Sequence, residues 1–202
     1  MEISRAELKR NALDSLKGNW GIAVAVTLIY LVICSVIGVI PVIGWIAAII
    51  CTPALVLGLQ IFFLKMARNQ DPEVQDLFAG FSSFGKAFCL YFVMYIFILL
   101  WTLLFIIPGI IASFRYSMAF FILADNPEIG VLEAIRQSKE MMVGHKWRLF
   151  VLGLSFLGWA ILATLTFGIG YLWLCPYMIT TISNFYRTIK GEPLEAAAEL
   201  NV

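Results

Sequence analysis

The chain has 202 residues, of which 61% are hydrophobic and only 13% are charged, and its formal net charge is +1. A soluble domain of this length does not need so much apolar material, because its compact core would be filled long before. The mean hydropathy of +0.91 therefore excludes an ordinary soluble protein and indicates an integral membrane protein. No nucleic-acid partner is expected.

Six apolar stretches approach or reach the roughly 20 residues that cross a bilayer core. Every backbone N–H and C=O group in hydrocarbon must be paired internally, so these stretches are expected to be helices. The sequence predicts an all-α, polytopic membrane protein with six transmembrane helices at residues 20–40, 45–64, 87–106, 109–124, 147–166 and 170–187.

The basic residues indicate how the helices are oriented. All of the 14 Lys and Arg residues except Arg115 lie in residues 5–17, 65–86, 136–148 and 187–190, whereas the turns at 41–44, 107–109 and 167–169 carry no charge. Lys and Arg collect on the cytoplasmic side of a membrane. Both termini are therefore expected to be cytoplasmic.

Three polar segments that contain proline, at residues 69–73, 124–128 and 190–193, divide the apolar part of the chain. They predict a single membrane domain (1–190) built from three repeated units at about 4–68, 71–124 and 127–190, followed by a short mobile tail (191–202). Each unit is expected to contain an interfacial amphipathic helix and then a transmembrane hairpin. The amphipathic helices could instead be ordinary cytoplasmic connectors. The three units could close into a packed six-helix bundle or enclose a central cavity.

Capping signals mark where the amphipathic helices begin and end. Ser4 and Glu7 have capping-box spacing, and the pairs Asp71–Pro72 and Asn126–Pro127 suit the N-cap and first helical position of the second and third helices. A glycine is expected to stop each helix, namely Gly18, Gly85 and Gly144.

Arg115 is the one charged residue in the apolar stretches that does not lie at the end of its stretch, and it is about 9 Å from the turn at 107–109 by helical rise. An arginine without an acidic partner suits a phosphate, which its planar guanidinium binds with two hydrogen bonds. We expect a ligand site at Arg115 with Ser113, Tyr116 and Ser117 as neighbouring hydrogen-bonding groups. The alternative is that Arg115 only anchors its helix at the outer headgroups.

A second set of basic residues lies next to the membrane and could attract anionic lipid: Arg136, Lys139, Lys146 and Arg148. Glu133 and Glu140 dilute this charge, so a solvated helix face is the alternative. The four cysteines and single histidine match no metal, redox or nucleophile motif, and we expect no catalytic residue, no metal, no cofactor and no enzymatic activity.

One stretch of the chain carries a family resemblance. The sequence around Ile107-Pro108-Gly109, Arg115-Tyr116-Ser117, Ala124-Asp125-Asn126-Pro127 and Gly144-His145-Lys146-Trp147 resembles the bacterial membrane family called domain of unknown function 975. That family is distantly similar to the membrane domain of some glycerophosphodiester phosphodiesterases. The resemblance implies a multi-pass protein of a bacterial inner membrane and supplies no activity.

Three hypotheses of function follow. The first is a non-enzymatic protein in which Arg115 binds or moves an anionic lipid or a polyprenyl phosphate. The second is a structural or regulatory module that binds a membrane protein partner or a second copy of itself, and the third is a small transporter or pore.

Overall fold

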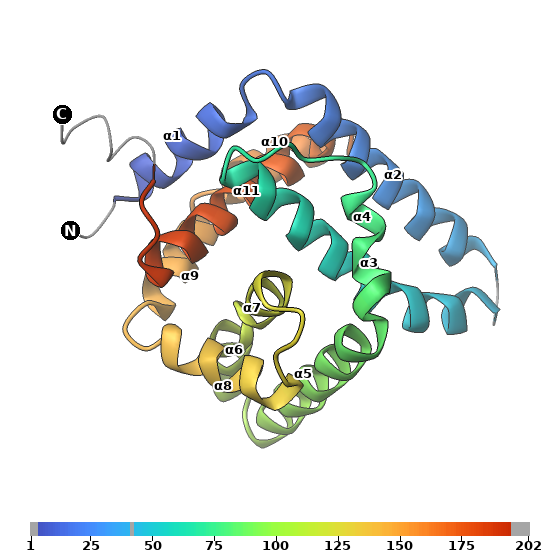
Figure 1. The fold of residues 1–202 in the computed structure, drawn as a ribbon, viewed down its shortest axis with the longest axis vertical. Helices are drawn as coiled ribbons and strands as arrows, with labels where there is room; N and C mark the ends of the chain where they lie inside the picture. Colours follow the sequence, from blue (N-terminus) through green and yellow to red (C-terminus); the bar gives the residue numbers. More distant parts are fainter. Residues whose placement is uncertain (1–3, 41–42, 195–202) are drawn as a thin grey trace.

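The computed structural model describes residues 4–40 and 43–194, so most of the expected tail (191–202) lies outside the described residues. This part of the chain is helical and contains no strand. The helices, labelled in Figure 1, are α1 (Arg5–Leu16), α2 (Trp20–Val39), α3 (Ile43–Ala67), α4 (Asp76–Ala79), the 3₁₀ helix η1 (Gly80–Ser83), α5 (Phe84–Leu104), α6 (Ile106–Tyr116), α7 (Ala119–Asp125), α8 (Val131–Met141), α9 (Lys146–Leu154), α10 (Leu157–Leu165) and α11 (Tyr171–Lys190).

Within residues 4–40 and 43–194, five helical stretches are long and apolar enough to cross a membrane, and the chain is a multi-pass membrane protein. They are Trp20–Val39, Gly44–Ala67, Asp76–Leu104, Ile106–Asp125 and Lys146–Leu165. The last two stretches each consist of two helices, because the helix is interrupted between α6 and α7 and between α9 and α10. A helix also forms at the sixth expected stretch, but α11 is not among these five in the described part of the chain. Its inner half is polar and buried, with Thr180, Thr181, Ser183 and Asn184.

The predicted capping box of α1 and the predicted glycines that end α1 and α8 are confirmed. Glu7 N–H donates to the Ser4 hydroxyl (3.2 Å) and Ser4 N–H donates to the Glu7 carboxylate (2.6 Å), which completes the predicted capping box of α1. Gly18 and Gly144 follow α1 and α8 with φ values of +82° and +79°, the left-handed conformation expected of a glycine that ends a helix.

The signals for the second helix are wrong in position. The helix begins at Asp76 instead of Pro72, because the Asp76 carboxylate accepts a hydrogen bond from Glu73 N–H (2.9 Å) and pairs with Lys65 (2.6 Å). Gly85 lies inside α5 and stops nothing.

The third amphipathic helix also starts later than predicted. It begins at Val131 with Gly130 as its N-cap. The Asn126 side chain accepts from Glu128 N–H (3.2 Å), so it closes a local turn instead of capping a helix.

The short helices pack against the longer ones. Helix α1 packs against α11, α4 and η1 pack against α3, and α8 packs against α7. The backbones of α3 and α4 approach each other directly, since a Cβ atom added at Gly58 of α3 would lie 1.8 Å from the Leu77 carbonyl oxygen of α4. Helix α7 is buried from Ala119 to Leu123 and lies near the middle of the ribbon in Figure 1.

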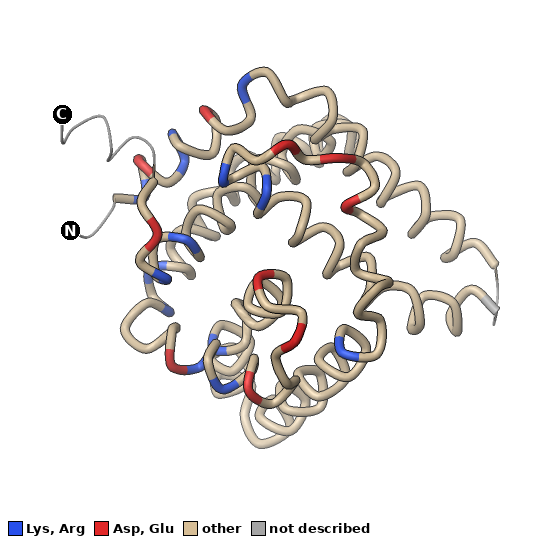
Figure 2. Tube along the Cα trace, in the orientation of Figure 1, with Lys and Arg blue, Asp and Glu red and all other residues tan. Residues whose placement is uncertain are grey.

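The opposite ends of the long helices are bare and apolar. Exposed residues there include Val36 on α2, Trp45 on α3, Leu103 on α5 and Leu165 on α10. Figure 2 shows that the end of the α2–α3 hairpin carries no charged residue. We call this side of the molecule the charge-free end and the other side the charged end.

Candidate functional site

Arg115 occupies the last turn of α6, immediately before the break that separates α6 from α7. Helix α6 begins at Ile106, so the predicted turn at 107–109 lies inside the helix and Arg115 is about 14 Å from the helix start instead of 9 Å. The side chain is half-buried, and within the described ranges its guanidinium makes no ion pair or hydrogen bond. Arg115 is therefore a cation in the middle of a candidate span, and it has no partner among the described residues.

The break beside Arg115 is held by Ser138 of α8. The fully buried Ser138 hydroxyl donates to the Arg115 carbonyl oxygen (2.8 Å) and accepts from Met118 N–H (3.2 Å). Sequence reasoning did not identify this role, although a serine in line with the buried residues Ala134 and Ile135 on the apolar face of α8 was a usable signal.

The other three residues expected to bind a ligand with Arg115 are engaged elsewhere. The hydroxyls of Ser113 and Ser117 donate to carbonyl oxygens of their own helix, at Ile110 (2.7 Å) and Phe114 (2.8 Å). Tyr116 is buried, and Lys139 Nζ lies 5.6 Å from the centre of its ring. The two serine hydroxyls are thus bonded within their own helix, and the structure brings Lys139 close to the end of α6.

A groove of about 340 Å³ lies between α6 and α9. We call it the α6–α9 groove, and its lining residues are Ile110, Ile111, Phe114, Lys146, Trp147 and Phe150. The rings of Phe114 and Phe150 meet edge to face at 5.9 Å. Arg115 follows Ile111 by four residues and so lies on the same face of α6, one turn nearer the charged end. The groove is apolar along its length and has Lys146 and the flanking Arg115 as cations.

The four residues predicted to form one basic surface do not form one. Arg136 is exposed and pairs with Glu133 (2.8 Å) and Glu140 (3.8 Å), and the hydrogen bonds from Arg136 lower the pKa of the Glu133 carboxyl. Arg148 lies 6.0 Å from the Phe185 ring of α11. Only Lys139 and Lys146 lie near α6.

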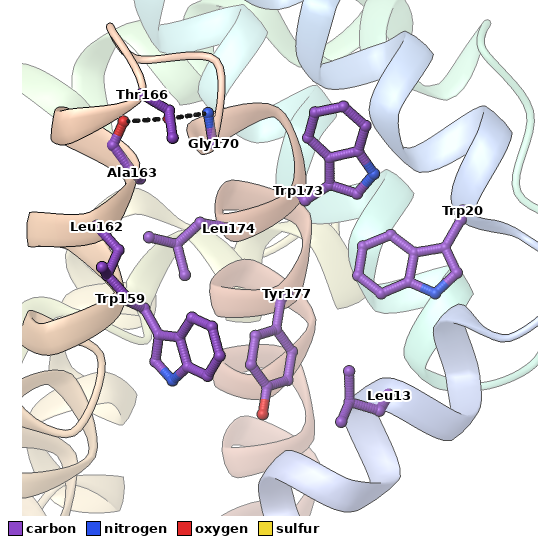
Figure 3. A pocket seen from close by; sticks show the side chains of 10 residues that line it. All are labelled: Leu13, Trp20, Trp159, Leu162, Ala163, Thr166, Gly170, Trp173, Leu174 and Tyr177. Carbon is purple, nitrogen blue, oxygen red and sulfur yellow. Dashed lines mark hydrogen bonds between the residues drawn. The ribbon is translucent and has the colours of Figure 1, made fainter.

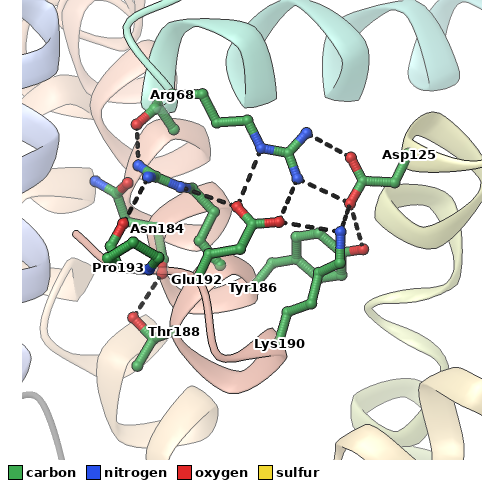
Figure 4. Close-up of polar contacts among 10 residues, drawn as sticks. Arg68, Asp125, Asn184, Tyr186, Thr188, Lys190, Glu192 and Pro193 are labelled. Atoms are coloured by element: carbon green, nitrogen blue, oxygen red, sulfur yellow. Dashed lines mark hydrogen bonds and ion pairs between the residues drawn. The ribbon is translucent and has the colours of Figure 1, made fainter.

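An ion-pair cluster joins the three polar segments that divide the sequence, and sequence reasoning did not predict it. Arg68 binds the Asp125 carboxylate with two hydrogen bonds (2.5 and 2.9 Å) and the Glu192 carboxylate with two more (3.1 and 2.6 Å). Lys190 contacts both carboxylates (2.6 and 3.0 Å), and Tyr186 donates to Asp125 (2.8 Å). Figure 4 shows these side chains converging from the ends of α3, α7 and α11.

The electrostatics of this cluster favour its charged form. Hydrogen bonds from Arg68 to Asp125 and Glu192 raise the pKa of the guanidinium against the effect of burial. Burial raises the pKa of the Glu192 carboxyl, but hydrogen bonds from Arg68 and Lys190 outweigh it and hold the value below the ordinary 4.5. All acceptors are used within the protein, so the arrangement indicates a structural clasp rather than a ligand site.

A second groove, of about 440 Å³, lies on the other side of the molecule between α1, α2, α10 and α11. Figure 3 shows aromatic side chains around it, among them Trp20, Trp159, Trp173 and Tyr177. It is apolar and contains no charged lining residue in the described part of the chain. No group of His, Cys, Asp and Glu residues within residues 4–40 and 43–194 could hold a metal ion.

Comparison with known proteins identifies the family. A family model described as "Protein of unknown function (DUF975)" matches residues 1–112 and 103–193, and the chain belongs to this family. No curated protein and no solved structure matches the chain.

Proposed function

Since membership of the DUF975 family assigns no activity, we propose a function from the side chains themselves: a non-enzymatic membrane protein that binds an anionic lipid through Arg115 at the α6–α9 groove. The observation that carries this proposal is the half-buried guanidinium of Arg115 with no partner in the described residues. An ionisable residue at such depth is costly and is rarely retained without a role.

The groove beside Arg115 has the two chemical parts that a phospholipid requires. Its apolar floor, with Ile110, Phe114 and Phe150, suits an acyl or isoprenoid chain. Lys146 and Arg115 lie toward the same end of the groove. A phosphate there would accept hydrogen bonds from the Arg115 guanidinium and would be attracted by the positive charge of the Lys146 ammonium group.

The proposed scaffold for this site is a threefold repeat of an amphipathic helix and a membrane hairpin. Its support is the order of packing, in which α4 covers the preceding α3, α8 covers the preceding α7, and α1 covers α11, which closes the ring. We further propose a bacterial inner membrane location with both termini cytoplasmic, because the basic residues gather at the charged end.

Native mass spectrometry of protein released from mild detergent with lipids attached tests the proposal. We expect wild type to retain a defined anionic phospholipid or polyprenyl phosphate and Arg115→Leu to lose it. Arg136→Leu is the matched control, because Arg136 is exposed and already paired with Glu133.

Equal and unselective lipid adducts on all three proteins would overturn lipid binding through Arg115. That result would favour the second hypothesis, a partner-binding module. Within the second amphipathic segment, such a partner could contact Phe78, which is exposed, but not Leu77, which is fully buried against α3.

A further inference from the structure

Basic side chains of three helices, α1, α6 and α8, lie beside the middle part of the candidate spans. Lys139 Nζ is 5.7 Å from the Phe97 ring of α5, and Lys9 Nζ donates to the Ser155 carbonyl oxygen (3.2 Å) at the break between α9 and α10. By helical rise, Phe97 is about 10 Å, Arg115 about 14 Å and Ser155 about 15 Å from the charge-free end of its span.

These depths are about a third to a half of the roughly 30 Å thickness of a bilayer core. Helix α8, which carries Lys139, also exposes Arg136 and Glu140 on its outer face. Charged side chains are not stable in hydrocarbon and need water or headgroups. Water or headgroups of the leaflet at the charged end must therefore reach down beside α8 to the level of Arg115.

We propose that the protein thins the bilayer at the α6–α9 groove and there allows phospholipids to cross from one leaflet to the other. This inference rests on the proposed function, because it uses the same site, and it names the activity of that site as lipid scrambling. The substrate class is a phosphate-bearing lipid with two acyl chains.

The groove supplies a route for such a lipid. Arg115 holds the phosphate level with the end of α6, where Lys139 lies beside the Tyr116 ring. The groove continues from Lys146 past Phe114 to Ile110, one to two turns nearer the charge-free end. The remaining hydrocarbon is about half as thick as in the surrounding bilayer. A headgroup therefore has a shorter apolar barrier to cross, while its chains stay in lipid or against the groove.

The test uses the purified full chain in liposomes that contain a trace of NBD-labelled phosphatidylglycerol, with dithionite added outside. We expect dithionite to bleach the label of both leaflets with wild type and only the outer label in empty vesicles. Arg115→Leu and Lys139→Leu should each slow scrambling about fivefold. Arg10→Leu should scramble like wild type, because Arg10 is exposed on α1, which does not line the groove.

Bilayer thickness gives a readout that does not depend on any variant folding. Wild type should scramble faster in vesicles of short-chain phosphatidylcholine and slower in long-chain vesicles, since a thicker bilayer costs more to thin. Bleaching of only the outer label by inserted wild type, rates independent of chain length, or bleaching of an encapsulated water-soluble NBD dye, which marks a leak, would each overturn scrambling.

The two proposals fail separately. Selective lipid retention by wild type without scrambling would overturn scrambling and leave lipid binding through Arg115 standing. Scrambling that depends on thickness but is unchanged in Arg115→Leu would support thinning and overturn binding through Arg115.

Discussion

The Ser138 hydroxyl of α8 bridges the break in the α6–α7 span by donating to the Arg115 carbonyl oxygen and accepting from Met118 N–H. Both backbone groups lost their helical partner at the break, and Ser138 is completely buried. One side chain therefore satisfies both sides of an interrupted membrane helix and fixes the position of Arg115.

Replacing Ser138 with alanine should destabilise the protein by about 1–3 kcal/mol, because two buried backbone groups lose their hydrogen bonds. Thermal unfolding in detergent measures this loss. Ser155→Ala is the control, since the Ser155 hydroxyl only donates to Leu152 of its own helix. Equal melting temperatures for Ser138→Ala and wild type would contradict the bridging role.

The ion-pair cluster should make stability depend on acidity. Glu192 has a pKa below its ordinary 4.5 in the folded protein, so its ion pairs stabilise the fold above that pH and the stabilisation is lost as the pH falls through the lower folded value. The melting temperature of wild type should decline across this acidic range. Glu192→Gln should melt lower near neutral pH and show a smaller decline, and an unchanged decline would show that other carboxylates cause it.

Gly58 should not tolerate a side chain. In Gly58→Ala the new Cβ would lie 1.8 Å from the Leu77 carbonyl oxygen, so α4 would have to move away from α3 at a cost of about 1–3 kcal/mol or more. Gly85→Ala is the matched control, because a Cβ there meets nothing within 4 Å and Gly85 lies in α5. Limited proteolysis should cleave residues 69–83 faster in the first variant only.

Lys9 should matter more for stability than its neighbour Arg10. Lys9 Nζ binds the Ser155 carbonyl oxygen and lies 4.2 Å from the Phe156 ring centre, and burial, with the nearby Arg5, lowers its pKa. Lys9→Met should lower the free energy of unfolding by about 1 kcal/mol. Arg10→Met, whose side chain is 82% exposed, should change it little, and similar melting curves for the two variants would argue against the Lys9 contact.

Local signals allowed much of the helical architecture to be predicted. Apolar length predicted α2, α3 and α5 to within a few residues, and the Ser4–Glu7 pair predicted the start of α1. These features depend on neighbouring residues, and so they are legible in one sequence.

Features that depend on tertiary contacts could not be predicted in the same way. The helix break after Tyr116 is stable because Ser138, distant in sequence, binds it, and the start of α4 moves to Asp76 because Lys65 pairs with it. The depth of Arg115 was wrong because the turn falls at Phe105, before the Pro108–Gly109 pair that suggested it. The candidate site could be located at Arg115, but not the groove or Lys139.

The cluster at Arg68, Asp125 and Glu192 also has a consequence for biosynthesis. Its residues lie at the ends of the first, second and third pairs of apolar stretches, and Glu192 is the last of the three to be synthesised. Before Glu192 is synthesised, Arg68 can pair only with Asp125. Helix α1 likewise cannot pack in its final position until α11, the helix it covers, has been synthesised. Insertion of the hairpins can proceed in sequence, but the cluster is completed only after Glu192 has been synthesised. A chain truncated before Glu192 would lack the ion pair between Glu192 and Arg68. Such an incompletely assembled protein would be open to degradation by membrane proteases.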